Sequence, residues 1–136
     1  MTPQAMADMH ARAFAPERGW RAEEFASLVA SPFVTCLSVG GGFALIRTVA
    51  DETELLTLAV DPSHRRKGVA TQLMQDWLTT VAAQSAYLEV ASDNGAAMAL
   101  YLKHGFAIVG RRAGYYARPD GPAVDAVLMQ AALTHR

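Results

Sequence analysis

The sequence predicts a single α/β domain in which a mixed β-sheet is flanked by helices. Three observations support this fold class. Stretches with the β-rich or alternating pattern of strands are interspersed with amphipathic stretches of helical period. The chain has 136 residues, a length that suits one domain. No internal repeat, low-complexity stretch or linker composition divides it. We therefore expect residues 1–136 to fold as one unit.

The first half predicts two short helices, a hairpin and a central strand. Apolar residues recur at helical spacing in the two opening segments, and three glycines separate two β-rich segments as a hairpin turn would. The stretch ELLTLAV is so dense in apolar residues that we expect the sheet to be covered on both faces there. In order, these elements are helices over 3–14 and 20–29, strands over 33–39 and 43–49 around the glycines at 40–42, and a strand over 54–60.

The second half predicts two more helices and further strands. One apolar stripe runs along residues 68–83 and indicates a long amphipathic helix. Asn94 is a favourable N-cap for a helix that Gly105 closes in the C′ position. The remaining elements are a strand over 86–92, the helix over 96–104, and strands over 106–109, around GYYA at 114–117, and over 126–131 after a turn at 119–121.

Composition and charge exclude several classes of protein. With 51% hydrophobic residues and a net charge of −1, the chain can bury a core and lacks the basic excess of a nucleic-acid binder. Cys36 is the only cysteine, which excludes an intrachain disulfide and suits a reducing cytosol. We find neither a secretory signal nor the ~20 consecutive apolar residues of a membrane helix, so we expect a cytoplasmic location without a membrane partner. No metal site is expected, because the histidines are scattered: His10, His64, His104 and His135.

The junction between the strand over 54–60 and the long helix is a candidate anion site. At a helix N-terminus the backbone N–H groups are unpaired and the helix dipole presents positive potential. Gly68 lets the backbone approach a ligand closely, and Arg65, Arg66 and Lys67 add positive charge. The stretch is neither a Walker A loop nor a Rossmann glycine fingerprint. On these residues alone, a solvated helix start is the commoner explanation.

The residues before and after this turn favour an anion site over a solvated helix start. The run LAVDP at 58–62 is followed by RRKGVA at 65–70, and this strand, turn and helix resembles the acyl-coenzyme-A signature of the GCN5-related N-acetyltransferases. The resemblance implies acetyl-coenzyme A as co-substrate, with its pyrophosphate on the amides of the turn and its pantetheine along the main chain of Leu58 and Val60. In the family, Gln is commoner at the place of Arg65 and Gly at the place of Ala70. The implied coenzyme-binding residues are Leu58, Ala59, Val60, Arg65, Arg66, Lys67, Gly68, Val69, Ala70, Thr71 and Asn94.

The second half resembles the RimI-type branch of that family, and the resemblance extends over about residues 4 to 133. The stretch YLEVASDNGAAMALYLKHGF carries the branch pattern LEV, then N-x-x-A-x-x-L-Y and GF, and RRAGYYARPDGPAVDAVLM carries its tyrosine pair and DG turn. Members of this branch acetylate the N-terminal alanine of a ribosomal protein. The resemblance therefore implies direct acetyl transfer to a protein α-amine, with the N-terminal alanine of ribosomal small-subunit protein eighteen as the expected acceptor.

Glu89 is the candidate general base. An α-amino group, with a pKa of roughly 7.7–8.0, needs only a modest base, and a carboxylate acting through a water would serve. In YLEV, alternation directs Leu88 and Val90 to one face and Glu89 to the other, beside the strand expected to hold the pantetheine. The resemblance implies that Glu89 is the base, whereas the alternative is an ordinary exposed strand glutamate.

Three tyrosines are the other candidates. Tyr101, with an ordinary pKa of about 10, stands two helical turns after Asn94, so both side chains lie on one helix face. The resemblance implies that Tyr101 protonates the leaving thiolate and that Asn94 contacts the coenzyme; core packing and a simple N-cap are the alternatives. Because side chains alternate along a strand, one of Tyr115 and Tyr116 should pack inward and the other should line an acceptor groove. The sequence does not decide which of the two faces the groove. Arg112 fits a substrate contact or a solvated strand end equally well.

Other functions remain compatible with these residues. Within the same chemistry, the acceptor could be a small amine, an amino-acid conjugate or a lysine side chain, because motifs define the acceptor pocket poorly. A non-catalytic acyl-coenzyme-A sensor would bind the cofactor without turnover, and the presence of both Glu89 and Tyr101 disfavours it. A nucleic-acid module is the weakest alternative, since the basic residues are few and are not interleaved with aromatic residues.

Overall fold

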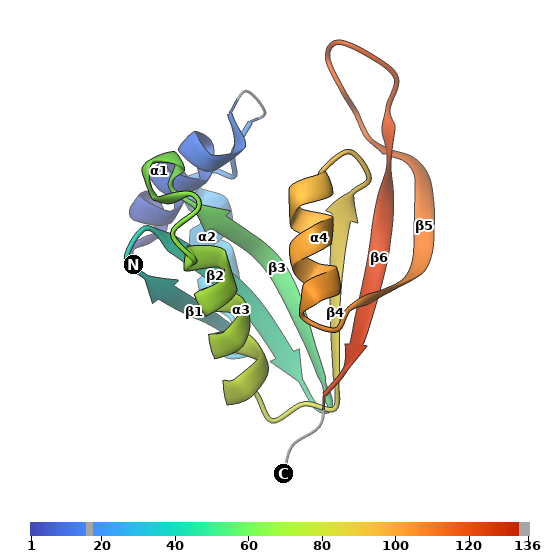
Figure 1. Cartoon of the computed structure of the whole chain (residues 1–136). Helices are drawn as coiled ribbons and strands as arrows, with labels where there is room; N and C mark the ends of the chain where they lie inside the picture. The colour runs from blue at the N-terminus through green and yellow to red at the C-terminus, as the bar shows by residue number, and fades with distance from the viewer. Residues whose placement is uncertain (16–17, 134–136) are drawn as a thin grey trace.

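The computed structural model describes residues 1–15 and 18–133, and Figure 1 shows their arrangement. The helical elements are α1 (Pro3–Phe14), α2 (Ala22–Val29), the 3-10 turn η1 (Pro62–His64), α3 (Val69–Thr80) and α4 (Gly95–Lys103). The strands are β1 (Val34–Val39), β2 (Gly42–Val49), β3 (Glu52–Val60), β4 (Ser85–Ala91), β5 (Ala107–Tyr116) and β6 (Val124–Ala132). Helix α1 has the predicted bounds, whereas α2 begins after Trp20 and α3 ends before Ala83.

The described strands form one mixed sheet in the order β1-β2-β3-β4-β6-β5. Neighbouring strands are antiparallel except for β3 and β4, which are parallel. This arrangement confirms the predicted fold class. The prediction of three strands after the last helix is wrong, because β5 is one strand that β6 pairs from Ala107↔Gln130 to Tyr116↔Val124. Two register shifts interrupt its pattern, one of them between Arg112 and Tyr116.

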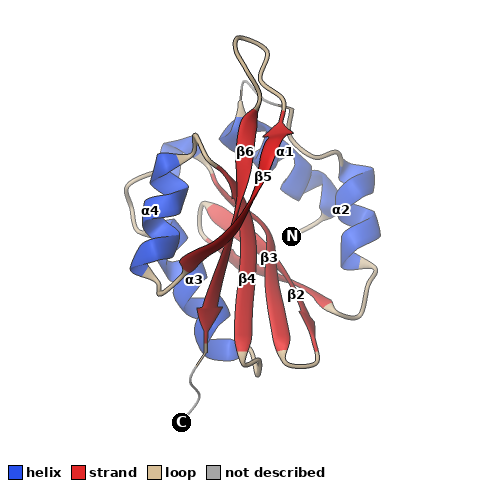
Figure 2. Ribbon diagram, turned by 90° about the vertical axis from the view of Figure 1, so that its right-hand side faces the viewer, coloured by secondary structure: helices blue, strands red, loops and turns tan. Residues whose placement is uncertain are grey.

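Helices cover both faces of the sheet (Figure 2). Helices α1 and α2 pack on one face, where Phe25 and Phe43 are fully buried. Helices α3 and α4 pack on the other face around Trp77, whose indole N–H donates to the Oγ1 atom of buried Thr53 at 2.9 Å. The central strands therefore carry apolar side chains on both faces, as the density of ELLTLAV predicted.

Strands β3 and β4 pair over a short distance and then separate. Their parallel pairing runs only from Glu52↔Ser85 to Glu54↔Tyr87. Directly after it, the β2–β3 register shifts and leaves Leu56 as an extra residue in β3. A bulge bends the strand that carries it, and Figure 1 shows β3 and β4 diverging toward their C-terminal ends. The end of β3 therefore has no ladder partner on its β4 side among the described residues.

Candidate active site

The turn between β3 and α3 presents free backbone N–H groups. Gly68 precedes α3 in the left-handed conformation, with φ 77°, and provides no side-chain cap. Because the first turn of a helix has no intrahelical acceptors for its N–H groups, those of Val69, Ala70 and Thr71 can bind an anion. Arg66 also has a positive φ, 65°, a region that is sparsely populated by residues other than glycine and that recurs at ligand-binding turns.

Asp61 anchors the start of this turn. Its side chain accepts hydrogen bonds from the Ser63 backbone N–H at 3.1 Å and from the Ser63 hydroxyl at 2.8 Å. The Arg12 guanidinium, at the end of α1, donates to the other carboxylate oxygen at 2.8 Å. The bonds from Ser63, followed by that from Arg12, lower the pKa of Asp61 to about 2. The turn is thus tied to α1 by a carboxylate that stays ionised.

The three basic residues of the turn have different surroundings. The Arg65 guanidinium donates to the carbonyl of Ala13 at 2.8 Å, so its side chain reaches back to the end of α1. The side chains of Arg66 and Lys67 are exposed. Of the three cations that the sequence predicts for the coenzyme, Arg65 therefore has a structural partner already, and Arg66 and Lys67 face solvent.

A close approach between β2 and α3 sets the position of the turn. A Cβ atom on Gly42 would lie 2.6 Å from Val69 Cγ1 and 2.9 Å from the carbonyl oxygen of Ala59. Only glycine lets the strand pass this close under the helix N-terminus. The three glycines were expected to form only a hairpin turn, and this contact with the helix was not predicted from the sequence. The run of glycines was the available signal.

The last residues of β3 alternate between the two cores. Leu58 and Val60 pack on the side of α3, and Ala59 packs on the side of α1 and α2. Their main chain pairs with β2, from Ala44↔Leu58 to Gly42↔Val60. Since the β4 pairing ends at Glu54, the other edge of this segment has no strand partner among the described residues.

Glu89 lies in a cluster formed by β4 and β5. Leu88 and Val90 are buried in the core, and Glu89 points to the opposite face, in agreement with the predicted alternation. The Tyr116 hydroxyl donates to Glu89 Oε1 at 3.3 Å, and Arg112 Nε lies 3.4 Å from Glu89 Oε2. Among the described residues each carboxylate oxygen has one partner, and it retains a second lone-pair position for a water or an amine.

The two tyrosines complete this cluster from different positions. Tyr116 is half-buried and contacts Glu89, whereas Tyr115 is 54% exposed. Their rings meet edge to face at 5.1 Å, and the Arg112 guanidinium lies 5.2 Å from the centre of the Tyr115 ring. Burial, together with the negative charge of Glu89, raises the pKa of Tyr116 to about 12. We refer to Glu89, Arg112, Tyr115 and Tyr116 as the Glu89 cluster.

Tyr101 lies on the other face of the sheet. It belongs to the same core as Leu88 and Val90, and burial raises its pKa to about 12, so the hydroxyl keeps its proton at neutral pH. The Asn94 side chain accepts a hydrogen bond from the Ala97 N–H at 3.2 Å and caps α4, while its amide NH₂ group can donate elsewhere. The fold thus groups Glu89 with the tyrosine pair and separates Tyr101 from them.

An arginine that the sequence did not single out fixes the segment between β5 and β6. Arg118 makes two hydrogen bonds to the Asp93 carboxylate, at 2.8 and 2.9 Å. Its guanidinium also lies 5.8 Å from the centre of the Tyr116 ring. These contacts join the segment after the tyrosine pair to the residue that precedes Asn94. No pattern in the sequence indicates this pairing, because the two residues lie on different elements.

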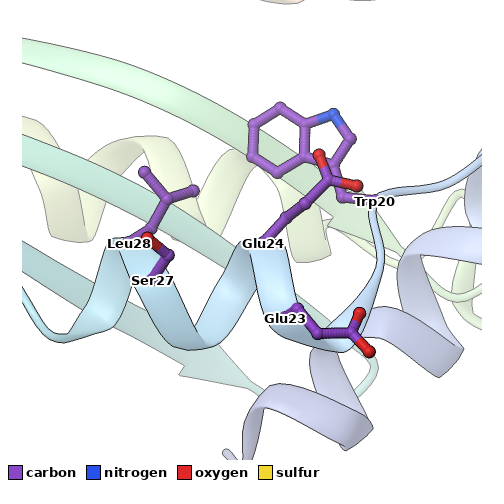
Figure 3. Close-up of a pocket in the computed structure, with 5 residues that line it drawn as sticks. All are labelled: Trp20, Glu23, Glu24, Ser27 and Leu28. Carbon is purple, nitrogen blue, oxygen red and sulfur yellow. The ribbon is translucent and has the colours of Figure 1, made fainter.

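A cavity of about 440 Å³ lies along α2, apart from these residues (Figure 3). Glu24, on its wall, accepts from the Arg21 backbone N–H and pairs with the Arg18 guanidinium at 3.0 Å, and these bonds lower its pKa. None of the predicted site residues lines this cavity. Its wall consists of Trp20, Glu23, Glu24, Ser27 and Leu28.

Residues 1–15 and 18–133 contain neither a cluster of metal-binding side chains nor a membrane-spanning helix. In this part of the chain, no three or more His, Cys, Asp or Glu side chains converge as a metal site would require. Over the same residues, no helix is long and apolar enough to cross a membrane. His135, one of the four histidines considered above, lies outside the described residues.

A family model supports the resemblance seen in the sequence. The model of the acetyltransferase (GNAT) family matches residues 8–106, more than half of the chain. The chain belongs to the GNAT acetyltransferase family. This GNAT protein is 33% identical over 122 residues to the N-alpha-acetyltransferase RimI of Mycobacterium tuberculosis, an alignment that covers 83% of this chain and 77% of the relative.

Two further comparisons lie in the same branch of GNAT proteins. The ribosomal protein bS18-alanine N-acetyltransferase of Escherichia coli strain K12 is 38% identical over 90 residues, which cover 64% of this chain and 60% of the relative. The match thus spans less than two thirds of that relative's length. The crystal structure of the ribosomal-protein-S18-alanine N-acetyltransferase from Escherichia coli superposes with a TM-score of 0.86 at 30% identity, covering 98% of this chain and 88% of the other.

As a GNAT enzyme, the protein is an acyltransferase of the acetyl-coenzyme-A-dependent class, as the resemblance predicted. Two structural observations fit this co-substrate. The free N–H groups at the start of α3 suit a pyrophosphate, and the main chain of β3 after Glu54 has an edge without a strand partner among the described residues. A secondary amide such as those of pantetheine can pair with such an edge.

Proposed function

We propose that this GNAT enzyme acetylates the N-terminal α-amine of a protein, and that the acceptor is the N-terminal alanine of a small-subunit ribosomal protein. The observation that carries the proposal is the similarity to the alanine N-acetyltransferase of this ribosomal protein from Escherichia coli, at 38% identity in the sequence alignment and 30% in the structural superposition. Glu89, held on the face opposite the core, supplies the base that this reaction requires.

The proposed role of Glu89 is to accept the proton that the amine must lose. An α-ammonium group cannot attack a thioester until it is deprotonated, and its pKa of roughly 7.7–8.0 lies within reach of a carboxylate acting through a water. The free lone-pair positions on Glu89 accept that water. The nitrogen then forms the new amide bond to the acetyl carbon, the carbon–sulfur bond breaks, and Tyr116 and Tyr115 line the approach of the acceptor chain.

The proposed role of Tyr101 is to return a proton to the departing sulfur. The Tyr101 hydroxyl is protonated at neutral pH and so holds a proton that the departing thiolate can take. Glu89 and Tyr101 lie on opposite faces of β4, beyond the last residue that pairs with β3. We therefore propose that the base and the acid act from opposite sides of the reacting carbon.

The remaining proposed contacts bind acetyl-coenzyme A, which supplies the activated acetyl group. The N–H groups of Val69, Ala70 and Thr71 bind the pyrophosphate, and Gly68 keeps their approach free. Arg66 and Lys67 add charge from solvent, and the Asn94 amide contacts the coenzyme beside α4. Arg65 acts by fixing the turn to α1. The main chain of Leu58, Ala59 and Val60 pairs with the pantetheine arm.

Mass spectrometry of candidate acceptors tests the proposed function. The protein is incubated with acetyl-coenzyme A and, separately, a peptide with a free N-terminal alanine, the same peptide with a blocked N-terminus, a peptide whose only amine is lysine, and a panel of small amines. We expect one acetyl group on the free-alanine peptide alone. Transfer only to lysine or to a small amine would keep the chemistry and overturn the acceptor. Coenzyme binding without any transfer would favour a sensor.

A further inference from the structure

We propose that Arg112 is a positioning residue of the acetyl transfer, which orients the carboxylate of Glu89 for its water. The inference rests on the proposed function, because it requires Glu89 to be the base. Arg112 reaches one carboxylate oxygen of Glu89, and Tyr116 reaches the other. A carboxylate held at both oxygens has a defined rotation, whereas a solvent-exposed strand glutamate samples several rotamers.

The sheet register brings Arg112 to this position. Arg112 on β5 is opposite Ala126 on β6, which in turn is opposite Ala91 on β4. Ala91 is two residues after Glu89, so the side chains of Arg112 and Glu89 are on the same face of the sheet. The Arg112 side chain therefore extends along the strand direction toward Glu89, and its Nε lies 3.4 Å from Glu89 Oε2. The neighbouring Arg111 is opposite Val127, a core residue, so it points to the other face and lies 3.9 Å from Asp125.

The Glu89 cluster forms a closed ring of contacts. Arg112 lies over the Tyr115 ring, Tyr115 meets Tyr116 edge to face, Tyr116 donates to Glu89, and Glu89 pairs with Arg112. Each member is thus held by two others. Because the Arg112 side chain is 54% exposed, the ion pair contributes little to the stability of the fold. Its proposed effect is to hold the Glu89 carboxylate in one orientation. Tyr115 stiffens the arginine from its exposed side.

The other residues around Glu89 do not offer a second cation to orient its carboxylate, among those that the structure describes. On β4 its neighbour on the same face is Tyr87, whose hydroxyl accepts a hydrogen bond from Gln130 at 3.4 Å. On β6 the residue opposite Glu89 is the apolar Leu128. On the Tyr116 ring lies the guanidinium of Arg118, 5.8 Å from the ring centre, and Arg118 is paired with Asp93. Among the described residues that face Glu89, Arg112 is the cation with an ion pair to it.

Steady-state kinetics on the free-alanine peptide test the proposal. Arg112→Met removes the guanidinium and keeps the aliphatic stem, Arg112→Lys keeps the charge, and Arg111→Met is the matched control from the other face. For Arg112→Met we expect kcat to fall about 10- to 100-fold with unchanged KM for peptide and acetyl-coenzyme A, because a misplaced base slows the chemical step without weakening binding. Arg112→Lys should recover part of this loss, and Arg111→Met should retain wild-type kinetics. Melting temperatures check folding.

A double-mutant cycle with Glu89→Gln separates positioning from any independent effect. If Arg112 acts through Glu89, Arg112→Met should add no further loss to Glu89→Gln. An equal loss in both backgrounds, a raised peptide KM at normal kcat, or the same kcat loss in Arg111→Met would overturn the positioning role. If Glu89→Gln were inactive and Arg112→Met fully active, the positioning role of Arg112 would be overturned while Glu89 would remain the base. Near-normal turnover of Glu89→Gln would overturn the base itself.

Discussion

His10 should make the stability of this domain depend on pH. The residue is 3% exposed, and its ring stacks on those of Phe14 and Trp20, with centroid distances of 4.3 and 5.1 Å. The Trp20 backbone N–H donates to Nδ1 at 3.0 Å, so the proton of the neutral ring lies on Nε2, which faces Thr57 Oγ1 at 3.0 Å. A second proton on Nδ1 would remove the first bond and place a charge among apolar rings.

The size of the effect follows from the pKa of His10. Burial lowers it from 6.5 to about 4. The unfolded chain binds this proton below about pH 6.5 and the folded chain only below about pH 4, so stability is greatest above pH 6.5 and falls as the pH drops through this window. One unit of pKa is about 1.4 kcal/mol; the full loss is therefore about 3 kcal/mol, of which about 2 kcal/mol is reached by about pH 5.

Urea unfolding at about pH 7.5 and about pH 5 measures this loss. The comparison is with His10→Gln, which has no titratable group at this position. We expect the wild type to lose about 2 kcal/mol more than the variant, from the linkage just described. The carboxylates with a lowered pKa, Asp61 among them, contribute at lower pH and are common to both proteins. Equal losses in the two proteins would refute the assignment of a buried neutral ring.

Three substitutions test the site and the turn. Glu89→Gln should lower kcat about 100-fold or more in the peptide assay, as loss of a general base does; turnover close to wild type would remove Glu89 from the mechanism. Tyr101→Phe should lower kcat by about 10-fold or more at an unchanged melting temperature, whereas an unchanged kcat would leave thiolate protonation to water. Gly42→Ala should destabilise the fold by about 1–3 kcal/mol and weaken acetyl-coenzyme A binding, because its Cβ would lie 2.6 Å from Val69 Cγ1. Gly40→Ala, with nothing within 4 Å, is the control, and equal melting temperatures in calorimetry would contradict the steric argument.

Elements with strong local signals could be predicted from the sequence. Helix α1 occupies Pro3–Phe14 as expected, because its spacing of apolar residues and the proline in its first turn act locally. Asn94 caps α4, and Gly105 has a positive φ, 92°, as expected of the glycine that ends this helix. The course of β5 could not be predicted, since its pattern is interrupted and only pairing with β6 makes it one strand. A local pattern carries no information about a partner strand.

The family, the elements β3, α3, β4 and α4, and the candidate residues Glu89 and Tyr101 could be read from the sequence, because they depend on motifs and on alternation along one segment. How these residues lie relative to one another depends on the folded sheet. The bulge at Leu56 separates β3 from β4 just beyond their last pairing. The β6 register then brings Arg112 and Tyr116 to the carboxylate of Glu89. These contacts join residues on different strands, and strand order and register, which set such distances, are properties of the folded sheet.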